Sequence, residues 1–312
     1  MNIKNKRHVV TLSDLTNSDI ENIVDRGVEF ASGKANGIRP LEGKVVGIYF
    51  RKTSTRTRTS FTTAALNLGA QVISYGPNDL QENTGESAED TAKVLSRMLD
   101  GFVARTAGSK EEMNTFASQN TMAVVNAMTE DEHPTQALAD LTTLKQQFGK
   151  IENLRILYVG EGNNTAAALA LSIPRFSNTD LIFATPEGYG VNPDILKEAN
   201  RLSAEHGSQV REYHDLDHIP AGQEIDVIYT TRWQTTGTSK PDPNWKEKFI
   251  PFTVTKELML KYPKAIFMHD LPAHRGEEVE SEVIDGVGSI VFNQAENKKH
   301  SAMAVLEWCM KD

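Results

Sequence analysis

Apolar and amphipathic segments alternate along almost the whole chain. Short runs rich in Val, Ile, Leu, Phe and Tyr, typical of buried strands, are separated by longer segments with the three- to four-residue period of helices. We predict strands over Val45–Phe50, Gln71–Tyr75, Gly101–Arg105, Thr121–Asn126, Arg155–Val159, Asp180–Ala184, Asp226–Thr230, Ala265–His269 and Ser289–Phe292. We predict helices over Ser18–Ala31 and over residues 56–69, 88–99, 109–119, 134–148, 164–175, 192–206 and 295–311. This alternation implies parallel sheets with helices on both faces.

The chain length, 312 residues, suits two domains of roughly 150 residues better than one core. A boundary is expected near residues 148–151, where a helical segment ends and a polar turn precedes a new strand. We therefore expect an α/β protein with two doubly wound parallel-sheet domains and an active-site cleft between them. Their expected bounds are residues 1–149, completed by a C-terminal helix at about 293–312, and residues 150–292. The segment Gly237–Pro251 lacks periodicity and is expected to be a mobile loop.

The composition narrows the class of protein. The formal net charge of −9 disfavours a general nucleic-acid or membrane-surface binder, because those partners select an excess of Lys and Arg. The single cysteine, Cys309, leaves no disulfide within the chain and favours a reducing compartment. No apolar run approaches the roughly 18 residues of a membrane span. We expect a cytoplasmic protein.

Metal and nucleotide signatures are missing from the sequence. It contains neither a His-Glu-x-x-His pattern nor a cysteine pair. The turn Gly160–Thr165 follows a predicted strand but lacks the third glycine of a dinucleotide fingerprint. We therefore expect no metal and no cofactor, which disfavours a nucleotide-dependent dehydrogenase.

An anion site is predicted at the turn between the strand Val45–Phe50 and the next helix. The turn reads Ser54-Thr55-Arg56-Thr57-Arg58. Hydroxyls and free N–H groups at a helix N-terminus favour an anion, and arginines at 51, 56 and 58 supply fork-shaped donors for phosphate oxygens. The alternative is an arginine-rich solvated face.

The segment from Phe50 to Arg58, Phe-x-x-x-Ser-Thr-Arg-Thr-Arg, resembles the carbamoyl phosphate signature of the aspartate and ornithine carbamoyltransferases. Three further segments are similar to that family in the same order along the chain: Asp90–Met98 with Arg105, His133–Asp140, and His269–Gly276. The last resembles the ornithine branch's His-Cys-Leu-Pro-Ala-His-Arg-Gly. The chain is therefore identified as a member of that family.

The resemblance implies a donor site for carbamoyl phosphate. Its residues would be Ser54, Thr55, Arg56, Thr57, Arg105, His133, Gln136 and, sent from a neighbouring subunit, Gln81. The last contact implies a homotrimer, or a multiple of trimers, with shared active sites. Thr55, Arg105 and His133 are the catalytic candidates, because fixed donors stabilise charge that develops on a carbonyl oxygen. The leaving phosphate can accept the amine proton, so no protein nucleophile is needed.

The acceptor site differs from both branches of the family. Asn163 and Asn164 fit an Asn-Asn contact of the ornithine branch, but that branch's Asp-x-x-x-Ser-Met-Gly is replaced by the residues from Thr231 to Gly237. Arg232 and Gln234 instead resemble the Thr-Arg-x-Gln of the aspartate branch. Yet Thr84 stands where that branch has a lysine.

Two further substitutions leave alternatives open. Asp270 replaces a cysteine of the ornithine branch and either orients a cationic amine or forms an internal ion pair with Arg232. Lys298 replaces an arginine near the carbamoyl group, or is a surface helix residue with Arg275 in its place. The acceptor-binding set is Asn163, Asn164, Arg232, Gln234, Asp270, Leu271, Arg275 and Lys298. It favours ornithine or a shorter or modified relative as acceptor. Aspartate carbamoylation and a catalytically silent regulatory paralogue are the alternatives.

Overall fold

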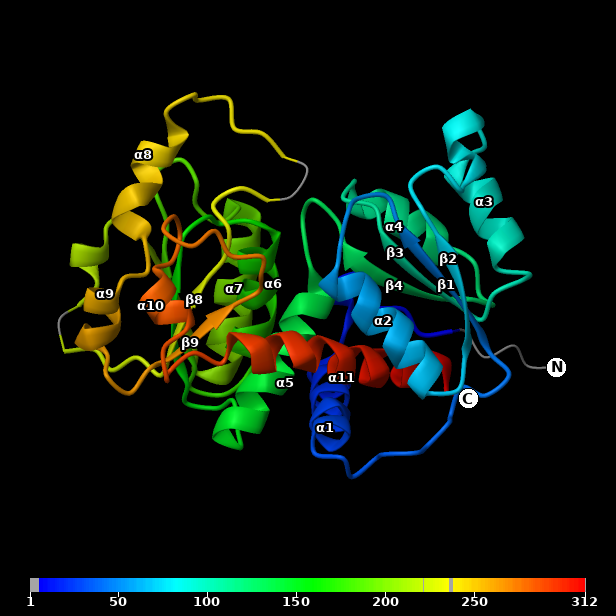
Figure 1. Ribbon diagram of the computed structural model, residues 1–312, viewed down its shortest axis with the longest axis horizontal. Helices are drawn as coiled ribbons and strands as arrows, with labels where there is room; N and C mark the ends of the chain where they lie inside the picture. The colour runs from blue at the N-terminus through cyan, green and yellow to red at the C-terminus, as the bar shows by residue number, and fades with distance from the viewer. Residues whose placement is uncertain (1–5, 221, 236–237, 312) are drawn as a thin grey trace. The chain divides into compact units, whose positions relative to one another are not determined.

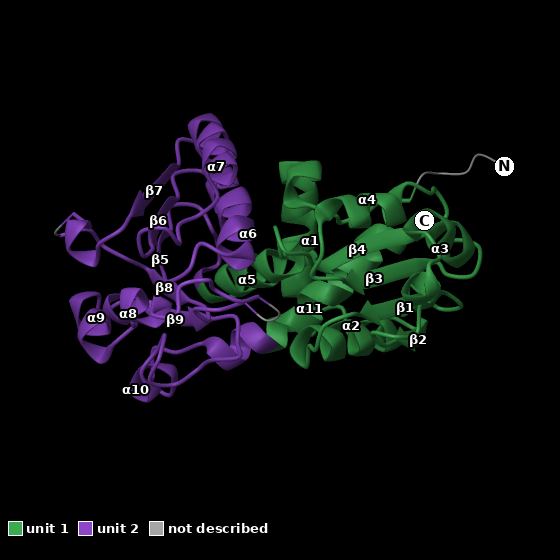
Figure 2. Cartoon of the chain, turned by 90° about the horizontal axis from the view of Figure 1, so that it is seen from above, with its two compact units in different colours: residues 1–147, 296–312 green, residues 148–295 purple. Residues whose placement is uncertain are grey.

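The computed structural model describes residues 6–220, 222–235 and 238–311 (Figure 1). The chain divides into two compact units, unit 1 with residues 1–147 and 296–312, and unit 2 with residues 148–295 (Figure 2). The sequence predicted a division between 149 and 150 and a return to the first domain at about 293. Each unit contains one parallel sheet with flanking helices, so the predicted pair of doubly wound α/β folds is confirmed.

Unit 1 contains a four-stranded parallel sheet in the order β2-β1-β3-β4. Its strands are β1 (Val45–Phe50), β2 (Gln71–Tyr75), β3 (Gly101–Arg105) and β4 (Ala123–Met128). Helices on both faces of this sheet (Figure 2) are α1 (Asn17–Ala31), α2 (Arg56–Asn67), α3 (Ala88–Leu95), α4 (Lys110–Ala117), α5 (Pro134–Phe148) and α11 (Val291–Met310). Tyr49 and Phe102 stack in its core with ring centroids 6.2 Å apart.

The first and last segments of the chain pack within unit 1. The Nε atom of Arg26 on α1 lies 2.8 Å from the Glu307 carboxylate on α11. The Arg7 guanidinium lies 4.7 Å from the ring centroid of Trp308. Val9 extends the sheet by a parallel bridge to Val125 of β4. The C-terminal helix therefore completes the first unit, although it is 150 residues away from the rest of that unit in sequence.

Unit 2 contains a five-stranded parallel sheet in the order β7-β6-β5-β8-β9. Its strands are β5 (Arg155–Val159), β6 (Asp180–Ala184), β7 (Gln209–Tyr213), β8 (Val227–Thr230) and β9 (Ile266–His269). Its helices are α6 (Asn164–Ser172), α7 (Pro193–His206), α8 (Trp245–Phe249), α9 (Lys256–Lys261) and α10 (Ser281–Ile284). Short 3-10 turns are η1 (Leu12–Asp14) and η2 (Gln81–Thr84) in unit 1, and η3 (Ile173–Arg175), η4 (Leu216–His218) and η5 (Ile250–Phe252) in unit 2.

Three secondary-structure predictions were wrong. Strand β7 was missed, because it lies at the sheet edge with a mostly polar sequence, QVREY. The predicted strand Ser289–Phe292 is a single bridge between Ser289 and Phe267, followed at once by α11. Short apolar runs do not distinguish a strand from a buried helix start. The predicted loop Gly237–Pro251 contains α8, whereas Gly237 itself lies outside the described residues.

Each sheet has one point at which the direction of strand addition reverses. In unit 1 the chain crosses from β1 to β2 on one side and onward to β3 on the other, and in unit 2 it does so from β5 to β6 and to β8. Ligands of open parallel sheets bind beyond the carboxyl ends of strands at such switch points. Residues 51–57 follow β1 and Arg105 ends β3, while residues 160–164 follow β5 and residues 231–234 follow β8. Most predicted site residues therefore lie at these two points.

Candidate functional site

The donor turn of unit 1 opens helix α2. Thr55 is the N-cap residue, and among the described residues its side chain makes no capping hydrogen bond. The first N–H groups of an uncapped helix remain able to bind an anion. Beside them, the Ser54 hydroxyl accepts a hydrogen bond of 3.3 Å from Nη1 of Arg105 on the neighbouring strand. A hydroxyl, helix N–H groups and a guanidinium thus meet at the switch point.

The other side chains of the turn are buried or bonded to groups outside it. Thr57 is 3% exposed and lies on the buried face of α2. Arg51 pairs with Glu82 at 3.0 Å and also with Glu112. Arg58 donates to the Ser74 hydroxyl at 2.7 Å. Of the three arginines predicted to bind phosphate, Arg51 and Arg58 are engaged by other side chains, and half-buried Arg56 stands at the start of α2.

Two buried basic residues lie near this turn. Arg105 is 9% exposed, and His133, which precedes α5, is 5% exposed. Burial, with the positive charges of Lys298 and Arg105 as smaller causes, holds the pKa of His133 well below its usual range. The imidazole is therefore neutral at neutral pH, and a neutral imidazole retains one N–H donor. Such a donor can hold a carbonyl oxygen without adding a further positive charge.

The structure corrects the prediction for Lys298. Its side chain is 8% exposed, so it is no surface residue, and its ammonium group donates to the Oε1 atom of Gln136. The Nε2 atom of Gln136 donates to Asp140 at 2.8 Å. Lys298 thus belongs to unit 1 beside the donor residues, and not to the predicted acceptor set. Tertiary packing of α11 on α5 brings together residues 162 positions apart.

Gln81 lies apart from this cluster in the chain segment between β2 and α3. It begins the turn η2 and is exposed, with Oε1 accepting a hydrogen bond of 2.8 Å from the Thr84 hydroxyl. Within one chain, Gln81 therefore faces the surface of unit 1.

Glu132, next to His133, is buried against neutral groups. One carboxylate oxygen accepts from the Leu12 N–H at 2.8 Å and the other from the Thr11 hydroxyl at 2.5 Å. Burial raises the pKa of Glu132 to about 7, and the hydrogen bonds from Thr11 and Leu12 oppose this effect. The folded protein thus holds a proton that the unfolded chain releases at about pH 4.3. The contribution of the protonated Glu132 carboxyl to the stability of the fold is complete at low pH and is lost as pH rises through about 7.

We expect Glu132→Gln to raise the melting temperature more at about pH 8.5 than at about pH 5.5. The neutral amide removes a burial cost that reaches roughly 3 kcal/mol once the carboxyl is ionised. Thermal unfolding of the variant and the parent at both pH values measures this difference. An equal shift at the two pH values would contradict a protonated Glu132 in the folded protein.

In unit 2, the turn after β5 requires glycine at one position. A Cβ atom on Gly162 would lie 2.2 Å from the backbone of Gly190 and Val191. The following Asn163 caps helix α6, with Oδ1 accepting from the N–H groups of Thr165 and Ala166 at 3.0 and 3.2 Å. The amide oxygen of Asn163 therefore caps α6. The sequence had predicted that this side chain contacts the acceptor. Asn164 is 5% exposed and opens α6.

Asp270 follows β9 and is held by two hydroxyl groups. Oδ1 accepts from Thr231 at 2.8 Å and Oδ2 accepts from Thr165 at 3.0 Å. Sequence reasoning missed both threonines, although Thr231 stands where the resembling family carries an aspartate. The carboxylate is therefore oriented by its neighbours, and Oδ1 also lies 3.4 Å from the Nδ1 atom of His269.

The segment after β8 carries the predicted carboxylate-binding residues. The Nε atom of Arg232 is buried and has no hydrogen-bond partner within residues 6–220, 222–235 and 238–311. Trp233 is 4% exposed and packs on Phe249, with ring centroids 5.5 Å apart. The Nε2 atom of Gln234 donates to the Thr238 carbonyl at 2.5 Å. Trp233 packs through its ring, and both its Nε1 atom and the Nε atom of Arg232 are buried donors without a partner among the described residues.

The segment after Asp270 includes two more predicted acceptor residues. Leu271 has a φ of 55°, a left-handed conformation that is unfavourable for a branched side chain. Arg275 forms two hydrogen bonds to Asp285, at 2.5 and 2.8 Å. In this structure its guanidinium group is thus paired at the surface of unit 2, and a contact from Arg275 to the acceptor stays a prediction.

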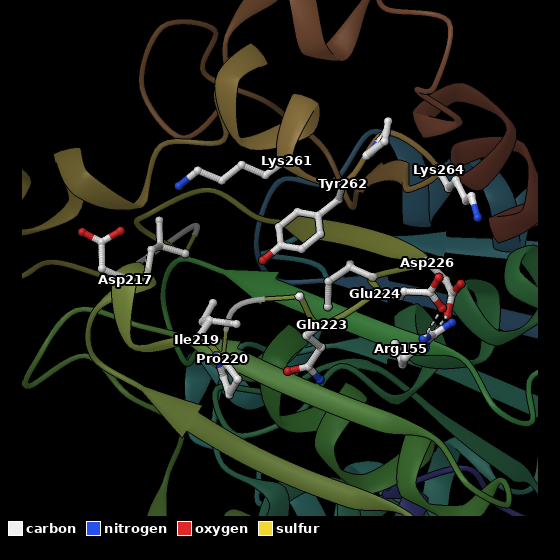
Figure 3. Close-up of a pocket in the computed structure, with 14 residues that line it drawn as sticks. Arg155, Asp217, Ile219, Pro220, Gln223, Glu224, Asp226, Lys261, Tyr262 and Lys264 are labelled. Atoms are coloured by element: carbon white, nitrogen blue, oxygen red, sulfur yellow. Dashed lines mark hydrogen bonds and ion pairs between the residues drawn. The ribbon is translucent and has the colours of Figure 1, made fainter.

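A cavity of about 680 Å³ lies at the opposite end of the unit 2 sheet (Figure 3). Arg155, Asp226, Ile219 and Tyr262 are among its lining residues. Its arginine is already paired, since Arg155 lies 2.7 Å from Glu224 and 3.2 Å from Asp226. Because the cavity adjoins the amino ends of β5 and β8, it is not where a parallel sheet binds its substrate.

His274, Glu277 and Glu278 bring potential metal-ligating atoms within 4.8 Å of one another. Glu278 already accepts from His269 at 3.1 Å and from the His274 N–H at 2.5 Å. Glu277 pairs with Lys246 at 2.8 Å. These carboxylates fix the loop after β9.

None of the helices in the described ranges is long and apolar enough to cross a bilayer.

Comparison with known proteins gives matches over nearly the whole chain. The family models "Aspartate/ornithine carbamoyltransferase, carbamoyl-P binding domain" and "Aspartate/ornithine carbamoyltransferase, Asp/Orn binding domain" match residues 7–146 and 152–309. An ornithine carbamoyltransferase of Thermococcus kodakarensis is 40% identical, covering 97% of this chain and 96% of the relative. One of Oceanobacillus iheyensis is 38% identical, covering 98% and 95%. The solved structure of ornithine carbamoyltransferase from Pyrococcus furiosus is similar with a TM-score of 0.91 and 38% identity, covering 98% of this chain and 97% of that one.

Proposed function

The chain belongs to the aspartate/ornithine carbamoyltransferase family and is a carbamoyltransferase, and from this premise we propose that its acceptor is ornithine or a shorter or modified diamino acid. In the proposed reaction the acceptor amine takes the carbamoyl group of carbamoyl phosphate and inorganic phosphate is released. Unit 1 supplies the donor residues and unit 2 supplies the acceptor residues.

We propose that the phosphate of the donor binds at the start of α2. The groups that would hold it are the first N–H groups of the helix with the side chains of Ser54, Thr55 and Arg56. Thr57 would contribute through its backbone, because its side chain is buried. Gln136 would act through its neighbours, since its amide is bonded to Asp140 and Lys298. The contact between Arg105 and Ser54 supports this assignment.

Arg105, His133 and Thr55 would act on the carbonyl group of the donor. Attack by a neutral amine places negative charge on the carbonyl oxygen, and fixed donors in a dry site stabilise that charge. Neutral His133 and cationic Arg105 are both nearly buried, which strengthens such interactions. The carbon–nitrogen bond forms as the bond from carbon to the phosphate oxygen breaks. The departing phosphate takes the proton from the amine, so both substrates need only be held in line.

The observation that carries the acceptor proposal is the carboxylate of Asp270 between two hydroxyls. A carboxylate so oriented attracts an ammonium group and repels a second carboxylate. This disfavours aspartate, which carries two carboxylates and one amine. The buried Nε of Arg232 suits the single carboxylate of an amino acid. Asn163, Asn164, Gln234 and Leu271 would border the acceptor.

A catalytically silent paralogue is disfavoured by the intact donor set. Such a protein would be free to lose Ser54, Arg105 or His133, and all three are present, with Ser54 and Arg105 in contact. The buried Nε donor of Arg232, which has no partner among the described residues, also argues for a site that binds a ligand.

The test is to offer carbamoyl phosphate with a panel of amines and to follow carbamoylation by mass spectrometry. We expect product with ornithine, diaminobutyrate, diaminopropionate or an acylated ornithine. Putrescine lacks the carboxylate for Arg232, and aspartate has no second amine and carries a second carboxylate that Asp270 would repel, so both serve as controls. Carbamoylation of aspartate alone, or of no amine in the panel, would refute the acceptor proposal.

We also propose that the protein works as a cytoplasmic homotrimer, or a multiple of trimers, whose active sites are completed by Gln81 of a neighbouring subunit. Exposed apolar side chains occur on α2, on the edge strand β2, on α3 and just after α3: Leu66, Ile73, Val94 and Met98 are 44–70% exposed. Such side chains on an unpaired sheet edge suit burial against another subunit. The buried thiol of Cys309, the only cysteine, suits a reducing compartment.

Mixing two inactive variants tests the shared site. Arg105→Met and Gln81→Ala are each expected to lose most activity alone. Equal mixtures refolded together would place both kinds of subunit in about three quarters of trimers, each with one intact site, so activity should return to about a quarter of wild type. No recovery in mixed trimers, verified by light scattering and mass spectrometry, would contradict the contribution of Gln81 across subunits.

A further inference from the structure

Lys240 has a buried charge that the proposed reaction does not use. It lies in the segment between Gln234 and α8, yet its side chain is only 6% exposed. Its ammonium group pairs with the Glu161 carboxylate in the turn after β5. It also lies 4.9, 5.3 and 5.2 Å from the ring centroids of Tyr189, Trp245 and Phe249. One ammonium group is therefore enclosed by three aromatic rings and one carboxylate.

The three rings form a packed cage. The Tyr189 and Phe249 centroids are 4.9 Å apart, and Trp245 stands nearly perpendicular to Phe249 at 5.4 Å. Tyr189 follows β6, and the other two rings belong to α8. Rings around a cation, with a carboxylate to balance its charge, are a characteristic arrangement for binding ammonium groups. We refer to Glu161, Tyr189, Trp245 and Phe249 as the ammonium cage.

Two neighbouring lysines show that aromatic contact alone does not produce this burial. Lys246 and Lys248 lie 5.8 and 5.6 Å from the rings of Trp245 and Tyr189. Their side chains are 56% and 53% exposed, and their carboxylate partners are at least one third exposed. Lys240 alone among these three lysines combines ring contacts, a carboxylate that is 17% exposed, and near-complete burial.

The cage connects the two segments that the proposed function assigns to the acceptor. Glu161 precedes Asn163 by two residues after β5. Lys240 follows Gln234 by six residues after β8. The hydrogen bond from Gln234 to the Thr238 carbonyl links the glutamine to the part of the segment that leads to Lys240. Fixing Lys240 therefore fixes the segment after β8 against the turn after β5 at the switch point of unit 2.

We propose that Lys240 is a positioning residue for acceptor binding, whose ammonium group fastens the segment after β8 into the ammonium cage. This inference rests on the proposed function and adds a residue that touches neither substrate. Arg232 and Gln234 then meet the acceptor in one arrangement without a search through other loop conformations. Such preorganisation contributes to acceptor affinity and leaves the donor site of unit 1 unaffected.

The test compares Lys240→Ala with Lys248→Ala, which removes the same charge from an exposed position of the same segment. We expect Lys240→Ala to raise KM for the acceptor at least about tenfold and to change KM for carbamoyl phosphate less than about twofold. Lys248→Ala should leave both constants within about twofold of wild type. Tetramethylammonium, which has no N–H and cannot be carbamoylated, can enter the emptied cage of Lys240→Ala but has no bond to the segment after β8, so the acceptor KM should stay raised.

Several results would overturn the inference. The first is equal behaviour of the two variants, and the second is equal losses for both substrates with a lower melting temperature. The third is an acceptor KM that tetramethylammonium restores to the wild-type value. If wild-type protein carbamoylates no amine, the proposed function fails separately. Tryptophan emission then decides about the cage, because Trp245 borders Lys240: the emission should change in Lys240→Ala and return with tetramethylammonium. An unchanged spectrum would overturn the inference.

Discussion

Replacing Arg105 by methionine is expected to lower kcat by about 10²–10³-fold, the usual loss when one donor to a developing oxyanion is removed. Arg105 ends β3 at the switch point of unit 1, is 9% exposed, and reaches Ser54 in the donor turn. Methionine retains much of the length and apolar stem, so the core around β3 should remain packed. Steady-state kinetics with carbamoyl phosphate and the best acceptor measure the loss.

Arg58→Met is the matched control for this prediction. Arg58 belongs to the arginine-rich donor segment whose Ser54 contacts Arg105, but it is exposed and bonds to Ser74. Its replacement should change kcat less than about twofold, as for most surface substitutions. Similar losses in the two variants would mean that the segment acts through its total charge. A loss below tenfold for Arg105→Met would remove Arg105 from the catalytic set.

The sequence was sufficient to predict the two sheets and the edges where chemistry occurs. Strands β1, β3 and β5 are buried on both faces, so their apolar runs are continuous and their bounds were correct. Strand β7 was missed because an edge strand needs only one buried side chain, Val210, and carries polar residues elsewhere. Burial on both faces made β1, β3 and β5 predictable, whereas the edge strand β2 (Gln71–Tyr75) has no buried residue and was predicted from its β-branched and aromatic residues.

Individual side-chain partners were harder to predict than site segments. Asn163 was expected to bind the acceptor, but it stands at a helix start, where an asparagine oxygen caps N–H groups. Arg275 was expected at the site, and in this structure it forms two bonds to Asp285. Lys298 meets Gln136 only because α11 folds back onto α5. Motifs fix which segment approaches a site, whereas long-range packing fixes which atoms of that segment are available.

The unusual acceptor residues form a consistent pattern once their partners are known. Thr231 stands where the resembling ornithine branch has aspartate, and Asp270 stands where it has cysteine. The carboxylate is thus moved from the end of β8 to the end of β9, and the new Thr231 donates to it at 2.8 Å. The neighbouring Arg232 adds a positive group beside the vacated position. An amine-binding carboxylate and a carboxylate-binding guanidinium then stand at the ends of the neighbouring strands β9 and β8, which suits the proposed diamino-acid acceptor.

Asp270→Asn should therefore raise KM for the acceptor about 10- to 100-fold, corresponding to the loss of one charge-assisted hydrogen bond. The amide retains the shape and can still accept one threonine hydroxyl, so the end of β9 should keep its structure. Kinetics with each carbamoylated amine measure the effect, and carbamoyl phosphate binding should be unchanged. Asp217→Asn, which removes an exposed carboxylate from the same unit, is the control. Equal acceptor constants in the two variants would contradict the role of Asp270.

The pH dependence of Asp270→Asn identifies which amine the carboxylate holds. A nearby carboxylate favours the charged form of an amine and raises its pKa, whereas only the neutral amine attacks the donor. If Asp270 holds the reacting amine, the variant should lower the pKa of the bound amine. The alkaline rise in kcat would then begin at lower pH in Asp270→Asn than in wild type. A rise at unchanged pH, together with a raised acceptor KM, would place the carboxylate on the amine that does not react.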